Sequence, residues 1–192
     1  MKILGISGSL RRGSYNTALL RAAAELVPED VELEIWEGLK TVPPYDHDDD
    51  TEEAPAAVAD LRSAVAGADA VLIATPEYNA SIPGVLKNAL DWVSRPVLTN
   101  PLRNKPAAVV GASTGAFGAV WAQAELRKVL STIGARTLDL EVACRQAAQR
   151  FDENGVLLDD DDVRAELRQV VNELVAATRA RAEAQASVPF AA

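Results

Sequence analysis

Short apolar runs alternate with longer amphipathic stretches along nearly the whole chain. Residues 2–6 form a compact apolar run that ends in a Gly/Ser-rich turn, and residues 16–27 then carry alanine and leucine at helical spacing as far as Pro28. Further strands are expected at 31–36, 70–75, 107–111 and 137–142, and further helices at 54–66, 83–93, 119–133 and 163–184. The pattern predicts five strands and five helices in alternation.

The expected strand at 70–75, AVLIAT, has the composition of a strand buried on both faces of a parallel sheet. Parallel strands joined by helices make right-handed crossovers, and ligands collect beyond the carboxyl ends of the strands, where the strand order reverses. We therefore look for chemistry in the loops after the first, third and fourth strands. With 192 residues, the chain suits one domain, predicted at 1–185, with a frayed tail at 186–192.

Charge and cysteine content narrow the class of protein. The formal net charge of -9 disfavours nucleic acid and anionic membrane surfaces as partners. The first apolar run is too short for a signal peptide core or a membrane span. Cys144 is the only cysteine, so neither an internal disulfide nor a thiolate metal cage is available, as suits a reducing cytoplasm. We expect a cytoplasmic protein that binds neither nucleic acid nor membrane.

The loop after the first strand, GSLRRGSYN, places hydroxyls, glycines and two arginines before a helix. A helix N-terminus offers unpaired N–H groups and a partial positive charge to a phosphate. Ser9, Ser14, Asn16 and Thr17 offer further hydrogen bonds, and Arg11 a charge-assisted one. The loop has neither the P-loop lysine nor the GxGxxG pattern, which favours a mononucleotide phosphate. The alternative is a solvated loop with Ser14 as an ordinary helix cap.

The other two loops have the composition of a ligand cradle. PEYNASIPG at 76–84 holds two prolines that stiffen it, and Pro83 suits the first position of the next helix. Such a segment can hold a planar ring, with Tyr78 at its edge, although a plain loop with Ser81 as helix cap is equally consistent with the residues. The glycine-rich ASTGAFG at 112–118 permits a close approach of ligand to backbone, or a tight strand-to-helix turn.

Together these motifs resemble the NADPH-dependent FMN reductase family of flavodoxin-like proteins, which includes quinone, azo and chromate reductases. GSLRRGSYN is similar to the family's phosphate loop, PEYNASIPGVLKNALDW to its isoalloxazine-binding segment, and ASTGAFG to the loop that closes the other side of the ring. The resemblance implies a three-layer α/β sandwich with a five-stranded parallel sheet in the order 2-1-3-4-5. Two departures from the family pattern are Ala119, where relatives often have glycine, and the small Ala80.

The resemblance also implies a set of binding residues. The expected cofactor-binding residues are Ser9, Arg11, Ser14, Asn16 and Thr17 at the phosphate, Pro76, Glu77, Tyr78 and Asn79 at the ring, and Ser113 and Gly115 at the ring or ribityl chain. Backbone N–H groups of residues 77–79 are expected to position the flavin N5, and residues 113–115 to stabilise negative charge near N1 and O2.

The implied activity is electron transfer from NADPH or NADH, through bound FMN, to a small acceptor such as a quinone, an azo compound, chromate or free flavin. The flavin supplies the chemistry, so no catalytic side chain is expected. Donor and acceptor must meet the same exposed ring face, which predicts ping-pong kinetics. The alternatives are an electron carrier of the flavodoxin type, and a regulatory domain of the same fold without flavin.

Three further features are interpreted as structural. His47 lies in the acidic stretch YDHDDDTEE, which reads as a solvated loop rather than a metal site. Cys144 among apolar neighbours is typical of inert packing. Trp92 has the helical spacing of a core or subunit-interface residue, and the resemblance favours the interface of a homodimer or homotetramer.

Overall fold

A computed structural model describes residues 1–51, 53–158 and 161–187 of the chain. Its centre is a parallel sheet in the order β2-β1-β3-β4-β5, which confirms the expected order, and β6 pairs with the far end of β4. The strands are β1 (Lys2–Ser7), β2 (Glu32–Trp36), β3 (Ala70–Thr75), β4 (Pro106–Ala112), β5 (Arg136–Thr137) and β6 (Ala143–Cys144). The order reverses at β1, so the loops after β1 and β3 diverge there and leave room for a ligand.

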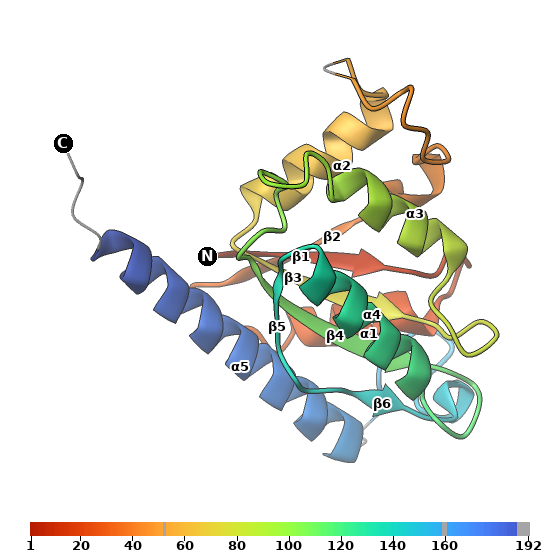
Figure 1. Cartoon of the computed structure of the whole chain (residues 1–192). Coiled ribbons are helices and arrows are strands. Elements are labelled where there is room, and N and C mark those ends of the chain that lie inside the picture. The colour runs from red at the N-terminus through yellow and green to blue at the C-terminus, as the bar shows by residue number, and fades with distance from the viewer. Residues whose placement is uncertain (52, 159–160, 188–192) are drawn as a thin grey trace.

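Helices cover both faces of this sheet (Figure 1). One face packs against α1 and α5 and the other against α2, α3 and α4. The bounds are α1 (Tyr15–Ala24), η1 (Gly38–Thr41), α2 (Ala56–Gly67), α3 (Gly84–Val93), α4 (Val120–Thr132), η2 (Ala147–Gln149) and α5 (Asp161–Ala186). Within the described residues, no helix is long and apolar enough to span a membrane.

The buried strands divide their side chains between the two faces. In β3, Ala70, Leu72 and Ala74 pack against the α1 and α5 face, whereas Val71 and Ile73 pack against the opposite helices. This alternation follows from the two-residue period of a strand, and it explains why the run is apolar at successive positions. The interpretation of 70–75 as a strand covered on both faces is therefore confirmed.

The expected strand at 137–142 is instead two short strands, β5 and β6, both paired with β4. The Gln123 side chain of α4 lies between them: its amide donates to the Val142 carbonyl at 3.0 Å and accepts from the Val142 N–H at 3.3 Å. The Val142 carbonyl also accepts from the Gly111 N–H of β4 at 3.0 Å, so Gln123 adds a second bond to that carbonyl and gives the Val142 N–H its partner. A buried amide therefore replaces part of the sheet edge, which residue spacing could not reveal.

Two helix boundaries differ from expectation for reasons of backbone geometry. Pro83 caps α3 rather than opening it, because its ψ of 138° is extended and the helix begins at Gly84. Helix α1 ends at Ala24 rather than residue 27, and Leu26 and Val27 pack against the core from a turn. The last helix extends to Ala186, and the expected frayed tail beyond residue 187 lies outside the described residues.

Trp92 is fully buried within the chain, which corrects the interface interpretation. Its indole N–H donates to the Pro43 carbonyl at 2.9 Å, and Tyr45 meets the ring edge-on at a centroid distance of 4.9 Å. A side chain with no exposed surface cannot contact a second subunit. Trp92 instead ties α3 to the segment after η1.

Candidate functional site

The loops after β1, β3 and β4 meet around one cavity of about 330 Å³ at the carboxyl edge of the sheet. We call this cavity the slot. Its lining residues are Ser9, Arg11, Ser14, Tyr15, Asn16, Pro76, Glu77, Tyr78, Ala112, Ser113 and Thr114. The structure thus brings together eight of the eleven predicted site residues. The other three, Thr17, Asn79 and Gly115, do not line the slot but adjoin residues that do.

Ser14 caps α1 at one end of the slot. Its hydroxyl oxygen accepts from the Thr17 N–H at 3.3 Å, so the hydroxyl hydrogen is free to donate to a ligand. Arg11 stays beside this cap because its guanidinium donates to the Gly13 carbonyl at 2.7 Å and lies 4.8 Å from the centre of the Tyr15 ring. A cation and a helix N-terminus therefore face the same end of the slot, which is the arrangement that stabilises an anion.

Asn16 and Thr17 have polar groups that already serve the fold. The Asn16 side chain is 3% exposed, donates to the Ala112 carbonyl at 3.0 Å and accepts from the Ala112 N–H at 2.9 Å. The Thr17 hydroxyl donates to the Ser7 hydroxyl at 2.9 Å. The Asn16 side chain thus joins α1 to the end of β4 and fixes two walls of the slot relative to each other, while its contact with the phosphate stays a prediction.

The segment after β3 is a β-hairpin rather than an irregular loop. Tyr78 and Ser81 exchange both backbone hydrogen bonds, at 3.0 and 3.1 Å. Asn79 and Ala80 between them have φ values of 53° and 60°. Two successive left-handed residues make the tight turn whose twist matches that of paired strands. Tyr78 is held at the lip of the slot with half of its surface exposed.

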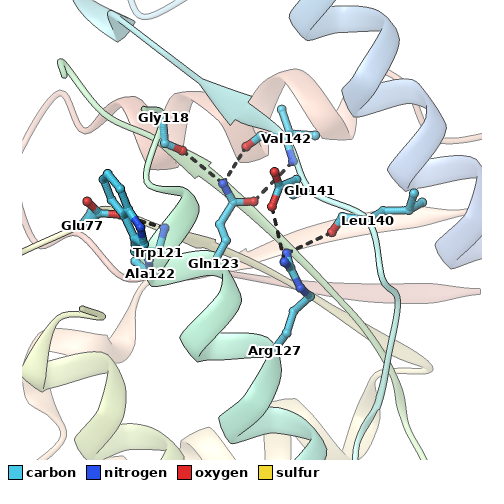
Figure 2. A network of polar contacts seen from close by, with 9 residues as sticks. All are labelled: Glu77, Gly118, Trp121, Ala122, Gln123, Arg127, Leu140, Glu141 and Val142. Carbon is cyan, nitrogen blue, oxygen red and sulfur yellow. Dashed lines mark hydrogen bonds and ion pairs between the residues drawn. The ribbon is translucent and has the colours of Figure 1, made fainter. Parts of the chain in front are cut away.

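The hairpin is anchored to α4 through Glu77 (Figure 2). One carboxylate oxygen of Glu77 accepts from the N–H groups of Trp121 and Ala122, at 3.1 and 3.2 Å. Ala119, at the N-cap position, has no side-chain oxygen to satisfy these donors and has a left-handed φ of 62°. The Glu77 carboxylate is therefore a helix cap supplied from another loop, and it stabilises the positive end of α4. This is a different role from the predicted ring contact.

Gln123 holds the third loop from beneath. Besides Val142, its amide nitrogen donates to the Gly118 carbonyl at 3.1 Å (Figure 2). The whole side chain is buried. Gly118 has a φ of 62°, and a Cβ there would lie 2.5 Å from the Ala143 carbonyl carbon, so only glycine fits. The backbone of Ser113 adds two hydrogen bonds, to Cys144 and Ala147, at 3.0 and 2.9 Å. The loop is thus fixed to β6 and η2.

The described residues around the slot offer binding groups rather than acid–base machinery. His47 lies in the loop after η1, 3.5 Å from the Tyr45 hydroxyl, and does not line the slot. Among the described residues, no group of three or more His, Cys, Asp or Glu side chains could hold a metal ion. Cys144 is fully buried in the core on the α1 and α5 face, which confirms that it packs there, and burial raises the pKa of its thiol to about 11.

The geometry suits a ligand with an anionic end and a flat end. The anionic end meets Arg11, the Ser14 hydroxyl and the N-terminus of α1, and the flat end lies among the hairpin and the loop after β4. A flavin mononucleotide has this shape and charge, and it needs no side-chain nucleophile because the flavin itself accepts and donates electrons. The residues present therefore fit FMN.

Comparison with known proteins supports this interpretation over most of the chain. A family profile for NADPH-dependent FMN reductases matches residues 1–149. An NAD(P)H-dependent FMN reductase of Pseudomonas aeruginosa is 47% identical over 161 residues, covering 83% of this chain and 86% of that protein. A 2-hydroxy-1,4-benzoquinone reductase of a Burkholderia species is 39% identical, covering 84% and 87%. The solved structure of FerB, a flavoenzyme NAD(P)H:(acceptor) oxidoreductase from Paracoccus denitrificans, superposes with a TM-score of 0.83 at 33% identity, covering 93% and 97%.

Fold and slot define a flavin-dependent oxidoreductase of the flavodoxin-like class. Within that class, the chain belongs to the NADPH-dependent FMN reductase family. Its cofactor is FMN, and its electron donor is NADPH or NADH.

Sequence reasoning missed several residues that shape the site. Tyr15, Ala112 and Thr114 line the slot, and their position next to predicted residues was the available signal. Gln123 carried no such signal, because it lies in the middle of a helix and acts on segments that a helical pattern does not identify.

Proposed function

We propose that this enzyme reduces quinones and related small acceptors with electrons from a nicotinamide, using FMN held in the slot. The observation that carries the proposal is the convergence of an anion-binding end and a flat, backbone-lined end in one cavity. Relatives named for benzoquinone and quinone reduction support the acceptor class. FMN bound there would supply the redox chemistry, as acceptor of a hydride from the nicotinamide and donor of two electrons to the acceptor.

At the phosphate end, Ser9, Arg11 and Ser14 bind the phosphate together with the first N–H groups of α1. Arg11 supplies the positive charge, because it is the one cation that lines the slot, and the negative charge of the Glu77 carboxylate is turned toward the N-terminus of α4. Ser14 donates its hydroxyl hydrogen while its oxygen continues to cap the helix. Asn16 and Thr17 contribute through the backbone and by keeping this loop attached to β1 and β4.

At the ring end, the hairpin restricts which backbone groups can face the flavin. The Tyr78 N–H donates to Ser81 within the hairpin, so the N–H groups of Glu77 and Asn79 are the ones that remain to orient N5. Pro76 and the Tyr78 ring complete this wall. Their rigidity holds the ring without loss of side-chain freedom on binding.

On the opposite side, Ser113 and Gly115 stabilise negative charge on the reduced ring. The Ser113 hydroxyl oxygen accepts from the Gly115 N–H at 3.1 Å, which leaves its hydrogen available for the N1–O2 edge. A Ser113→Ala variant is expected to bind FMN but to have a more negative flavin midpoint potential. An unchanged potential would remove Ser113 from this role.

Because one ring face serves both substrates, the donor must leave before the acceptor enters. Steady-state rates measured over a grid of NADPH and benzoquinone concentrations are expected to give parallel double-reciprocal lines. Intersecting lines would show that both substrates bind together and would contradict the alternating scheme.

Three further predictions accompany this function. A symmetric homodimer or homotetramer remains expected, because closed symmetric assemblies are the common state of soluble enzymes. The cytoplasm remains the expected location, given a lone cysteine that is buried. The chain is also expected to fold as one domain over residues 1–185.

A further inference from the structure

A second cavity of about 330 Å³ lies on the other side of the phosphate loop, beyond the carboxyl ends of β1 and β2. We call it the basic pocket. It shares Ser9, Arg11 and Ser14 with the slot but contains no residue of the hairpin or of the loop after β4. The two cavities are therefore neighbours separated by one loop, and an extended ligand can occupy both.

The charge of the basic pocket is opposite to that of the chain. Its lining holds Arg11, Arg12, Arg21 and Lys40 and a single acid, Glu37, in a protein whose formal net charge is -9. Throughout the part of the chain that the structure describes, Arg12, Arg21 and Lys40 form no ion pair with a carboxylate. Unpaired cations gathered in a concave surface attract a polyanion.

The phosphate of FMN is too small to contact all the cations of the basic pocket. That phosphate is met by Arg11 and the start of α1, whereas Arg21 lies seven residues beyond the Ser14 cap, roughly 10 Å further along the helix. Lys40 comes from η1, after β2. One phosphate cannot reach all of them, so the basic pocket has charge for a second anionic group.

The opposite wall of the basic pocket is apolar and held in place. Trp36 ends β2, its indole N–H donates to Asp60 at 2.8 Å, and its ring packs so closely over Gly38 that a Cβ there would lie 2.3 Å from the ring. Leu39 continues this wall and is buried. A fixed indole beside unpaired cations suits an aromatic base that carries phosphate.

We propose that the basic pocket binds the adenosine 2′-phosphate end of NADPH, while the nicotinamide end enters the slot. Arg12, Arg21 and Lys40 bind the 2′-phosphate, the Trp36 wall receives the adenine, and Glu37 accepts from the 3′-hydroxyl, which is the hydroxyl that this ribose keeps. The proposal rests on the proposed function and adds to it a preference for NADPH over NADH. NADPH is preferred because its 2′-phosphate adds two negative charges that NADH lacks and that the cations of the basic pocket attract.

Binding of nucleotide fragments tests the pocket without turnover. The FMN-loaded enzyme is titrated calorimetrically with adenosine 2′,5′-bisphosphate and with adenosine 5′-monophosphate. We expect the bisphosphate to bind about tenfold more tightly or better. An Arg12→Ala/Lys40→Ala variant should lose this selectivity, and a Lys128→Ala/Arg168→Ala variant, which removes two exposed cations elsewhere, should retain it. Equal binding of the two nucleotides, or equal losses in both variants, would overturn the proposal.

Two more measurements on the same variants separate the explanations. The Arg12→Ala/Lys40→Ala variant should show a KM for NADPH raised about tenfold, with the KM for NADH, kcat and the FMN dissociation constant unchanged. A matching loss of FMN affinity would assign the pocket to the FMN phosphate and overturn the proposal. If the enzyme oxidises neither nicotinamide yet binds the bisphosphate selectively, the proposed function fails and the pocket stands. If it oxidises both donors without that selectivity, the pocket fails and the function stands.

Discussion

The two ends of the slot are built in different ways. At the ring end, buried or long-range side-chain hydrogen bonds from Glu77 and Gln123 fix the hairpin and the loop after β4 to α4 and β6. At the phosphate end, Asn16 in α1 is also bound to the distant Ala112, but the loop before α1 is held by local contacts: Arg11 bonds to Gly13 and Ser9 to Ser7, each only two residues away, and residues 10–13 are exposed. The difference indicates that the fold sets the geometry of the ring end, whereas the phosphate loop is ordered by local contacts that a ligand can complete.

The largest effect is expected from removing the brace of the ring end. A Gln123→Leu variant removes the partner of the Gly118 carbonyl and of the Val142 N–H, and should lower the free energy of unfolding by roughly 3 kcal/mol. Urea unfolding measures this loss. The same substitution at the exposed Gln169 of α5 should cost less than about 0.5 kcal/mol. Equal effects at both positions would contradict the claim that the Gln123 hydrogen bonds hold the ring end of the slot in place.

Cys144, whose carbonyl accepts from Ser113, should make the ring end sensitive to alkali. Burial raises the pKa of this thiol from 9.0 to about 11, so the native state keeps a proton that the unfolded chain releases. This contribution to stability is complete below pH 9 and is lost between pH 9 and 11, by up to about 1.4 kcal/mol per pH unit. The wild-type curve of stability against pH should fall more steeply than that of Cys144→Ala in this range. Parallel curves would show that the thiol is not shielded.

The phosphate end should respond in affinity rather than in stability. An Arg11→Ala variant removes the one cation of the slot and should weaken FMN binding about tenfold, as followed by quenching of flavin fluorescence. Its unfolding free energy without FMN should change by less than about 0.5 kcal/mol, because Arg11 is exposed. A large loss of stability with unchanged FMN affinity would show that Arg11 serves the fold rather than phosphate binding.

The smallest effect concerns the hairpin turn. Ala80 is exposed and has a φ of 60°, a conformation that glycine adopts without strain. Ala80→Gly should therefore stabilise the protein by about 0.5–1 kcal/mol. Ala165→Gly, at an exposed position inside α5, should destabilise it by about as much. A loss of stability at both positions would contradict the left-handed turn.

The sequence predicts what depends on local pattern. Strand order, the helices on both faces and the Ser14 cap follow from residue spacing and from a motif resemblance, and the structure confirms them. The hydrogen bonds that Asn16, Glu77 and Gln123 form across the fold could not be predicted from the sequence, because they join segments far apart in the chain. Asn16 and Ala112 are 96 positions apart, and Glu77 reaches α4 across 44. The side chains of Asn16 and Glu77, which the sequence suggests as ligand contacts, thus form hydrogen bonds with backbone groups far away in the chain.

The hairpin and the broken last strand show a second limit. Asn79 suits the left-handed region, but Ala80 does not, so the sequence does not predict two successive left-handed residues at 79–80. The expected fifth strand is split between β5 and β6, and the Gln123 amide bonds to Val142 between them, a contact that the helical pattern around Gln123 does not reveal. Both features come from tertiary packing that overrides local preference.

The most direct test of the account is the visible spectrum of the protein reconstituted with FMN, recorded without oxygen before and after addition of NADPH or NADH. FMN is expected to stay bound and to bleach directly to its two-electron reduced form with either nicotinamide, and at lower concentrations of NADPH than of NADH. Bound flavin that neither nicotinamide reduces would contradict the oxidoreductase function, and a protein that binds no FMN would contradict the assignment of the slot.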